Sequence, residues 1–368
     1  MSSWYISNMV MVDNYKEKIK SYLDTEMLLR KYMPSTKTIG TCINCDALLS
    51  DKNYGKKLAQ NFNIVTTENN MKWQFIHPSE ANYSFIETDL IVDYCEKNNI
   101  SVRGHCLVWH EALPDWVWKI YKSKDYSRLK SVLLSHVETI VIRYKNKIKE
   151  YDVLNEIFSI DSNNKEGFRN KAENDNFESP WFNAFGKQIY IDVLQKIKTI
   201  DPSIECWIND FGIDQKGFIS LLKKIINFIN YANNLGLGKL IDGLSFQCHN
   251  YDPIGDPSIA SELKSNMQMV INDCGIKVRV SELDVAFASK NDSLFTDKLQ
   301  VCLDLPNCFS YGMWGFTDKY GSMNSPIVKK GSDNLKNPNY NCYISDGLIL
   351  DEFYNEKKAY EKMLDMII

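Results

Sequence analysis

The sequence predicts a single α/β domain, a (β/α)8 (TIM) barrel whose active site lies at the carboxyl-terminal ends of the strands. Three observations favour this fold. The length of 368 residues suits one α/β barrel. Eight short β-rich runs alternate with longer amphipathic segments, which predicts a parallel sheet closed into a barrel. No Gly-rich phosphate fingerprint follows any of these runs, which disfavours a doubly wound open sheet.

The predicted strands and helices alternate along residues 36–368, which we expect to form the catalytic barrel. Residues 1–35 are expected to form an N-terminal segment that packs on this barrel. The predicted strands are Thr38–Ile43, Asn63–Thr66, Ser101–Val108, Glu150–Leu154, Glu205–Ile208, Gly243–Gln247, Lys277–Ser281 and Ser310–Trp314. Apolar residues at helical spacing predict helices over Asp89–Asn98, Ser127–Lys145, Gly186–Lys198 and Phe218–Leu235.

Charge and hydropathy limit the possible partners. The net charge is −4 with both signs mixed along the chain, so the sequence lacks the basic stripe that nucleic-acid binding requires. No apolar run reaches the length of a bilayer span, so no membrane partner is expected. The amino terminus does not resemble a signal peptide. The protein is therefore either cytoplasmic, or exported after removal of a signal. We expect it to be a monomer.

Polar, acidic and aromatic residues stand at the carboxyl ends of six consecutive predicted strands. In a barrel these ends meet on one face. A single such residue more often caps the backbone and faces water, but six in a row favour a binding face. They are His105, Trp109 and His110; Asn155 and Glu156; Asn209 and Asp210; Gln247 and His249; Glu282 and Asp284; and Trp314.

Glu156 and Glu282 end the fourth and seventh strands, across the barrel mouth from each other. Hydrolysis of a glycosidic bond requires two carboxyl groups, one protonated and one ionised, on either side of the anomeric carbon. The sequence has neither a His-Glu-x-x-His zinc motif nor a Gly-x-Ser-x-Gly nucleophile elbow. It therefore predicts carboxylate-based hydrolysis with no metal and no cofactor.

The chain resembles the endo-1,4-β-xylanases of glycoside hydrolase family 10. The resemblance covers all but about the first thirty residues, and the order of its motifs is highly specific. The matching segments are residues 66–73 (TTENNMKW), 103–110 (RGHCLVWH), 152–156 (DVLNE), 208–211 (INDF), 241–249 (IDGLSFQCH), 281–284 (SELD), 314–318 (WGFTD) and 348–360 (LILDEFYNEKKAY).

The resemblance implies roles for individual residues. Glu282 matches the nucleophile of a retaining, double-displacement endo-hydrolase of xylan, and Glu156 matches its acid/base. Asn155 matches the residue that binds the sugar 2-hydroxyl. His249 matches a hydrogen-bond partner of the nucleophile, and Asp284 the residue that orients this histidine. Positions that bind sugar on the glycone side are matched by Glu68, Asn69, Lys72, His105, Trp109, Gln247 and Trp314.

The ten cysteines include Cys302 and Cys308, which flank a short Pro-containing segment. Their spacing alone leaves a local disulfide open. The resemblance implies such a bond, because many secreted members have one, and it therefore also favours export.

Four departures from the family pattern concern specificity. Relatives usually have Glu at Asn70, Gln at Ala112 and Tyr-Asn at 211–212, and many have a second tryptophan near Ser322 that roofs the glycone subsites. Ala112 and Ser322 are smaller than the Gln and Trp of these relatives, so we expect more room at the glycone subsites, an open roof over them. This leaves β-glucan and branched xylan as alternative substrates. A catalytically silent, glycan-binding barrel is the alternative from another class, and an assay for reducing sugars would distinguish it.

Overall fold

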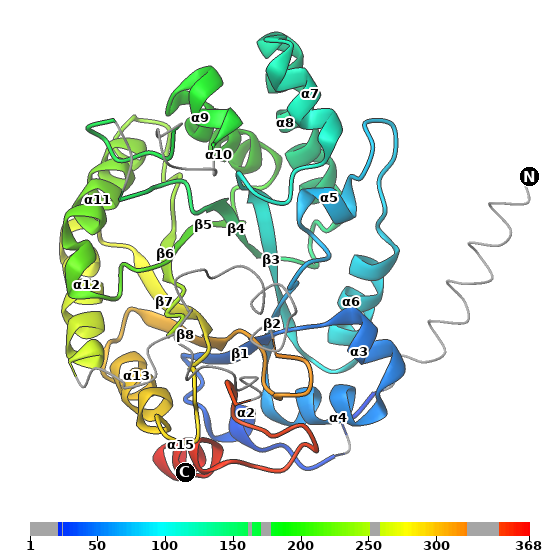
Figure 1. Ribbon diagram of the computed structural model, residues 1–368, viewed down its shortest axis with the longest axis vertical. Coiled ribbons are helices and arrows are strands. Elements are labelled where there is room, and N and C mark those ends of the chain that lie inside the picture. Colours follow the sequence, from blue (N-terminus) through cyan, green and yellow to red (C-terminus); the bar gives the residue numbers. More distant parts are fainter. Residues whose placement is uncertain (1–20, 24, 161–163, 171–177, 251–257, 322–345) are drawn as a thin grey trace, which may run out of the picture.

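Eight parallel strands form a closed barrel in which each strand pairs with the next in chain order, and β8 pairs with β1. The computed structural model describes residues 21–23, 25–160, 164–170, 178–250, 258–321 and 346–368. Figure 1 shows the strands inside a ring of helices. The strands are β1 (Thr38–Cys42), β2 (Ile64–Thr66), β3 (Ser101–Val108), β4 (Glu150–Asn155), β5 (Glu205–Asp210), β6 (Gly243–Phe246), β7 (Lys277–Leu283) and β8 (Cys308–Met313). The predicted (β/α)8 barrel is confirmed.

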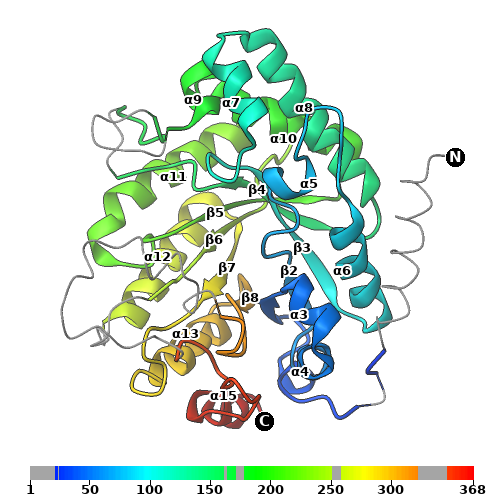
Figure 2. The same ribbon diagram turned by 45° about the vertical axis from the view of Figure 1, so that its right-hand side comes forward.

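The helices cover the outside of this barrel. Figure 2 shows α6 and α8 on one side of the strands and α11 and α12 on the other. The helices are α2 (Leu29–Tyr32), α3 (Cys45–Ser50), α4 (Lys52–Asn61), α5 (Trp73–Ile76), α6 (Ile86–Lys97), α7 (Asp115–Lys122), α8 (Tyr126–Arg143), α9 (Pro180–Phe185), α10 (Gln188–Ile200), α11 (Ile219–Asn233), α12 (Ile259–Cys274), α13 (Ser293–Asp304) and α15 (Lys358–Ile367). The four helices predicted from apolar spacing are confirmed as α6, α8, α10 and α11.

Local chemistry sets where several helices begin. The Asp125 side chain accepts a hydrogen bond from the Arg128 N–H at the start of α8. Ser179 caps α9 in the same way, and Pro180 occupies the first helical position. At the other end of a helix, Gly275 terminates α12 in the left-handed conformation, with φ +63°. These caps satisfy backbone groups that a helix end leaves unpaired.

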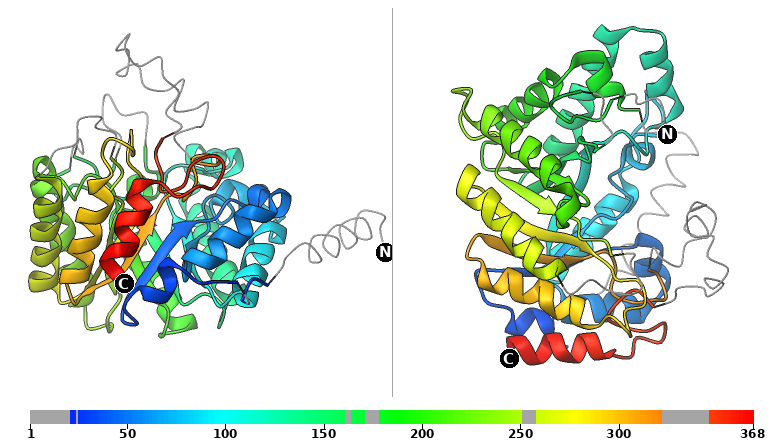
Figure 3. Two further views of the ribbon diagram at one scale, coloured as in Figure 1. Left: turned by 90° about the horizontal axis from the view of Figure 1, so that it is seen from below. Right: turned by 60° about the vertical axis from the view of Figure 1, so that its left-hand side comes forward.

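The N-terminal part that the structure describes lies against the barrel. Leu29 of α2 is fully buried, and Arg30 donates hydrogen bonds to the carbonyls of Ala59 and Asn98. The C-terminal helix α15 packs against α13 and α2, and Figure 3 shows it beside α13. The two ends of the described chain thus close the same side of the helical ring. Within the described residues, no helix combines the length and apolar character that a membrane crossing requires.

The interior of the barrel contains buried charges as well as apolar side chains. Arg279 of β7 and Asp152 of β4 are both fully buried and lie 2.6 Å apart. Arg279 Nε also donates to the Ser245 hydroxyl at 2.7 Å. Buried charges are costly unless they are paired and hydrogen-bonded, and here the barrel itself supplies the partners. Asp152 also contacts His105, whose Nδ1 lies 2.9 Å from Asp152 Oδ2.

Candidate active site

Glu156 and Glu282 both lie at the carboxyl ends of strands, as predicted. Glu282 is the sixth residue of β7, and Glu156 follows the last residue of β4. The Glu156 N–H donates to the carbonyl of Asn209 at 2.9 Å, which extends the β4–β5 pairing beyond the strand. Glu156 has φ +50°, a left-handed conformation that is uncommon for a residue with a side chain. Such conformations cluster at functional sites.

The Glu282 carboxylate is buried and accepts two hydrogen bonds. Asn209 Nδ2 donates to Oε1 at 2.6 Å, and His249 Nε2 lies 3.2 Å from Oε2. Burial alone would raise the pKa of Glu282. The hydrogen bond to His249 and the positive charges of His105, His249 and Arg103 outweigh it and lower that pKa to about 2. Glu282 is therefore ionised at neutral pH.

His249 connects Glu282 to Asp284. Its Nδ1 lies 2.7 Å from Asp284 Oδ1, while Nε2 faces Glu282. An imidazole that donates from both nitrogens carries a positive charge, and both of its partners are carboxylates. The arrangement predicted for His249 and Asp284 is present in the structure.

The Glu156 carboxyl group has a different environment from that of Glu282. Trp109 Nε1 donates to Oε2 at 3.0 Å, and Gln247 Nε2 donates to Oε1 at 2.9 Å. Both donors are neutral. The Arg169 guanidinium donates to the Glu156 backbone carbonyl at 3.1 Å and so helps to hold the main chain. The two glutamates therefore differ in the charge of their immediate partners.

Asn209 links β4 to β7, and sequence analysis placed it at a strand end of the predicted binding face but assigned it no role. Its Nδ2 donates to Asn155 Oδ1 at 2.7 Å as well as to Glu282, and its Oδ1 accepts from the Ser281 hydroxyl at 2.8 Å. Asn155 and Asn209 are register partners in the β4–β5 pairing. Two signals pointed to Asn209, namely its position at a strand end and its place in the matching segment 208–211.

Asp210 is a second strand-end residue of the predicted face to which sequence analysis assigned no role. It is buried, Oδ1 accepts from the Phe211 N–H, and Oδ2 has no hydrogen-bond partner of good geometry among the described residues. Burial, followed by the nearby charge of Glu156, raises the pKa of Asp210 well above its ordinary value. A buried carboxyl group in this position is most stable in its protonated form.

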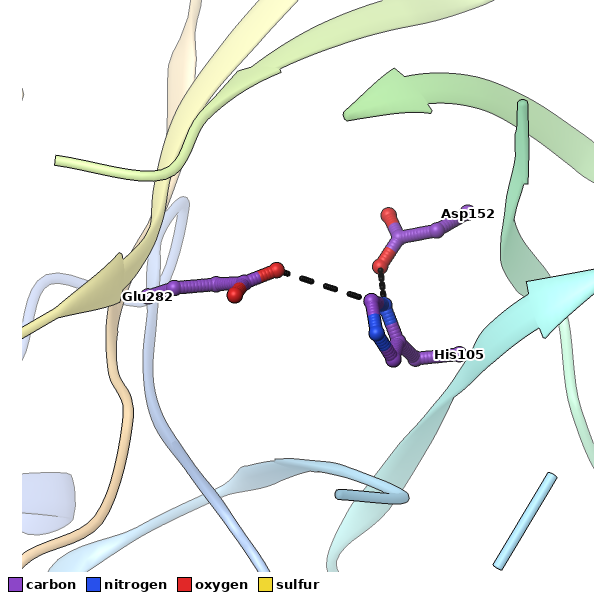
Figure 4. Close-up of side chains that lie close together, drawn as sticks. All are labelled: His105, Asp152 and Glu282. Atoms are coloured by element: carbon purple, nitrogen blue, oxygen red, sulfur yellow. Dashed lines mark hydrogen bonds and ion pairs between the residues drawn. The ribbon is translucent and has the colours of Figure 1, made fainter. Parts of the chain in front are cut away.

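His105 lies between Asp152 and Glu282, as Figure 4 shows. Its Nδ1 is 2.9 Å from Asp152 Oδ2 and 4.0 Å from Glu282 Oε1. Burial opposes ionisation of Asp152, but Arg103 and Arg279 lower its pKa below the ordinary range. The donor types of these three residues would also suit a metal ion. The two arginines already balance Asp152, however, so an ion-pair network accounts for the cluster.

A second group with metal-ligand geometry comprises His110, Glu111 and Glu156. His110 Nε2 lies 3.5 Å from Glu111 Oε1. Each Glu156 oxygen already accepts a hydrogen bond from a neutral donor. Hydrogen bonds and ion pairs thus account for both groups, and hydrolysis without a metal stays a prediction.

The residues predicted to bind sugar form one connected surface beside Glu156. Lys72 Nζ donates to Asn69 Oδ1 at 2.8 Å and lies 5.2 Å and 5.7 Å from the ring centroids of Trp109 and Trp314. Asn69 Nδ2 in turn donates to Glu68 at 3.3 Å. A cation between two indole rings and a row of hydrogen-bonding groups can bind the polar edges and apolar faces of a sugar.

Two further histidines, His77 and His136, belong to an aromatic cluster. His77 Nδ1 and His136 Nδ1 lie 3.1 Å apart, and His136 stacks on Trp73 at 3.9 Å between ring centroids. Trp73 also stacks on Trp181, whose Nε1 donates to the carbonyl of Trp109. Through the bond from Trp181, this aromatic cluster helps to fix the backbone at Trp109.

Of the residues that depart from the family pattern, Asn70, Ala112, Phe211 and Gly212 are described and Ser322 is not. Ala112 has φ +50° and its carbonyl accepts from the Gln74 N–H at 2.8 Å. Phe211 is 43% exposed directly after β5. The predicted roof gap at Ser322 lies outside the described residues.

The Cys302–Cys308 disulfide is not formed in the structure. Both residues are buried free thiols. The Cys302 thiol faces the Cys308 carbonyl at 3.8 Å, and the Cys308 thiol faces the Ser310 carbonyl at 3.8 Å. Cys302 lies within α13 and Cys308 begins β8, so backbone carbonyls satisfy both thiols. The expectation of a disulfide is wrong for this structure.

A (β/α)8 barrel with two differently surrounded glutamates at its mouth, next to a surface of aromatic and amide groups, defines a glycoside hydrolase. The chain belongs to glycosyl hydrolase family 10, whose sequence profile matches residues 28–366.

Individual relatives agree with this family membership. Endo-1,4-beta-xylanase B of Thermotoga neapolitana is 29% identical over 319 residues, or 83% of this chain and 85% of that protein. Endo-1,4-beta-xylanase 2 of Claviceps purpurea is 30% identical over 277 residues, covering 75% and 77%. The solved structure of xylanase 10B from Thermotoga petrophila RKU-1 in complex with xylobiose has a TM-score of 0.76 and 27% identity, covering 94% of this chain and 99% of that one.

Proposed function

We propose that this protein is an endo-1,4-β-xylanase that cleaves internal bonds of xylan with retention of configuration. The substrate class is supported by the family and by relatives named endo-1,4-beta-xylanase. One observation supports the division of roles. Glu282 is held ionised by His249, His105 and Arg103, whereas the Glu156 carboxyl contacts the neutral donors Trp109 and Gln247.

In the first step, Glu282 attacks the anomeric carbon while Glu156 transfers its proton to the oxygen of the leaving sugar. The glycosidic bond breaks and a covalent glycosyl-enzyme ester forms. In the second step, Glu156 removes a proton from water, and this water attacks the anomeric carbon and releases Glu282. Asn155 is placed to bind the 2-hydroxyl, a bond that strengthens as positive charge develops on the sugar.

Early-time proton NMR of the hydrolysis of a xylo-oligosaccharide tests this proposal. A retaining enzyme releases the β-anomer first, before mutarotation. Initial release of the α-anomer would contradict the double-displacement mechanism. A distance between the Glu156 and Glu282 carboxyl groups of roughly 6.5–9.5 Å, typical of inverting enzymes, would also contradict it, because retaining enzymes have about 5–5.5 Å. Size analysis of products from xylan and β-glucan, digested side by side, tests the endo action and the substrate.

We also propose that the protein acts as a monomer outside the cell, with cytoplasmic action on imported oligosaccharides as the alternative. The polymeric nature of xylan supports export. The expected disulfide no longer does, because Cys302 and Cys308 are free thiols.

A further inference from the structure

Lys298 is a fully buried cation directly behind the catalytic face. It belongs to α13, and its side chain has 0% exposure. Its Nζ lies 3.2 Å from Oδ2 of Asp214, which is itself buried, and 3.2 Å from the backbone carbonyl oxygen of Cys248. Burying an ammonium group costs several kcal/mol unless partners replace its water. Here a carboxylate and a carbonyl from two different loops take that place.

The two acceptors connect Lys298 to the ends of β5 and β6. Asp214 lies in the segment after β5, and Cys248 lies two residues after β6. Burial raises the pKa of the Cys248 thiol, which stays protonated and can hydrogen-bond to Asp214. One ammonium group thus joins α13 to both loops.

The carbonyl of Cys248 occupies a special place in the backbone. Cys248 has φ +62°, in the left-handed region that is unfavourable for a residue with a side chain. The next residue is His249, whose Nε2 lies 3.2 Å from Glu282. A turn held in an unfavourable conformation persists only when its surroundings fix it, and the bond from Lys298 is one such restraint.

An ion pair alone would not explain a lysine at this position. Replacing a buried ion pair by apolar side chains of similar volume is often neutral or stabilising, so folding does not require the charges. The second bond, to the Cys248 carbonyl, is the one that contacts the residue next to His249. This difference separates a positioning role from a purely structural one.

We propose that Lys298 is a positioning residue that fixes the Cys248 turn and thereby aims His249 at Glu282. The proposal rests on the proposed role of Glu282 as nucleophile. The charged groups around the ammonium are Asp214 and Asp284. Those around the Glu282 carboxylate are His249, His105 and Arg103. Asp284 also hydrogen-bonds to His249 at 2.7 Å, so both the carbonyl bond and the charge of Lys298 reach Glu282 through His249.

Three variants test this proposal. Lys298→Met removes the ammonium and leaves Asp214 as an unpaired buried acid. Asp214→Asn removes the ion pair but keeps the bond from Lys298 to the Cys248 carbonyl. The double variant Lys298→Met/Asp214→Asn removes both charges and leaves the carbonyl without its donor. For each variant we would measure Tm, and at 25 °C kcat and the pH profile of kcat/KM on a xylo-oligosaccharide.

We expect the double variant to recover much of the Tm lost in Lys298→Met, while its kcat stays about tenfold below wild type, as for one lost charge-assisted hydrogen bond. The acid limb of its kcat/KM profile should move to higher pH, because a displaced His249 stabilises the ionised Glu282 less. Asp214→Asn should lower Tm but keep the acid limb and at least about half of kcat.

Wild-type kcat and an unchanged acid limb in the folded double variant would overturn the proposal. If both variants at Lys298 fail to fold, Asp214→Asn still decides: an acid-limb shift in that variant would assign the effect to the ion pair and reject the role of the carbonyl bond, and no shift would support it. Failure of the nucleophile assignment is distinguishable, because it would appear as activity in Glu282→Ala with Lys298 intact.

Discussion

Nε2 of His249 lies 3.2 Å from Oε2 of Glu282, at the mouth of the barrel. The other nitrogen of the ring is held by Asp284 at 2.7 Å. Because Asp284 fixes one side of the imidazole, Nε2 on the other side is directed at the Glu282 carboxylate. Glu282 is buried, and burial alone would favour its protonated form. The histidine therefore helps to keep this buried carboxylate ionised.

Replacing His249 should make Glu282 harder to ionise. In His249→Ala the carboxylate loses a hydrogen bond and a nearby charge, so its pKa rises from about 2. A charge-assisted hydrogen bond is worth about 1.5–3 kcal/mol, which corresponds to roughly one to two pKa units. The acid limb of kcat/KM should move to higher pH by that amount. His249→Gln, which keeps a neutral donor, should shift it less. An acid limb identical to that of wild type in both variants would refute the role of His249.

The two glutamates should differ in their response to substitution. Glu282→Ala should abolish turnover of every substrate, because no glycosyl-enzyme can form. Glu156→Ala should still convert an aryl glycoside with a good leaving group, since that departure requires little protonation. Added azide should accelerate the second step of this variant only, giving a glycosyl azide. Equal loss of activity in the two variants on the activated substrate would show that the roles are assigned incorrectly.

Asp210→Asn should stabilise the protein at neutral pH but not in acid. The pKa of Asp210 is raised in the folded state, first by burial and then by Glu156. The folded state therefore keeps a proton that the unfolded chain releases above about pH 4, and this mismatch costs stability as the pH rises. Asparagine keeps the acceptor for the Phe211 N–H without that cost. The free energy of unfolding of the variant relative to wild type, measured in urea, should increase from pH 4 to pH 7. A difference independent of pH would contradict the assignment.

Ser322→Trp should increase the preference for xylan over β-glucan. This prediction rests on the sequence comparison at Ser322 and Ala112, where relatives usually have Trp and Gln. An added indole stacks on a sugar with a free energy on the order of 1 kcal/mol, several-fold in binding. It also leaves less room for the hydroxymethyl group of glucose. The ratio of initial rates on the two polysaccharides measures the effect, with Ser322→Ala as the size control. An unchanged ratio would reject the open-roof hypothesis.

The fold and the strand-end positions of Glu156 and Glu282 could be predicted because their signals are local in the chain. The β-rich runs at Thr38, Ser101 and Glu150 recur with helical segments between them, and the observed strands begin within two residues of the predicted positions. Glu156 and Glu282 were identified because each ends such a run, and barrel geometry places strand ends on one face. The hydrogen bonds of His249 with Glu282 and Asp284 agree with the roles that the family resemblance implied.

The partners of buried polar groups were decided by tertiary structure. The bond from Asn209 to Asn155 depends on the β4–β5 register, and Arg279 meets Asp152 across 127 positions of sequence. Lysine is a residue type that usually lies at the surface, yet the closed barrel buries Lys298 against Asp214 and Cys248. Cys302 and Cys308 have the spacing of a disulfide, but in the structure they are free thiols that contact each other and backbone carbonyls. Periodicity along a chain determines which face of an element is apolar, whereas the cost of burying a charge or a thiol depends on neighbours that only barrel closure brings together.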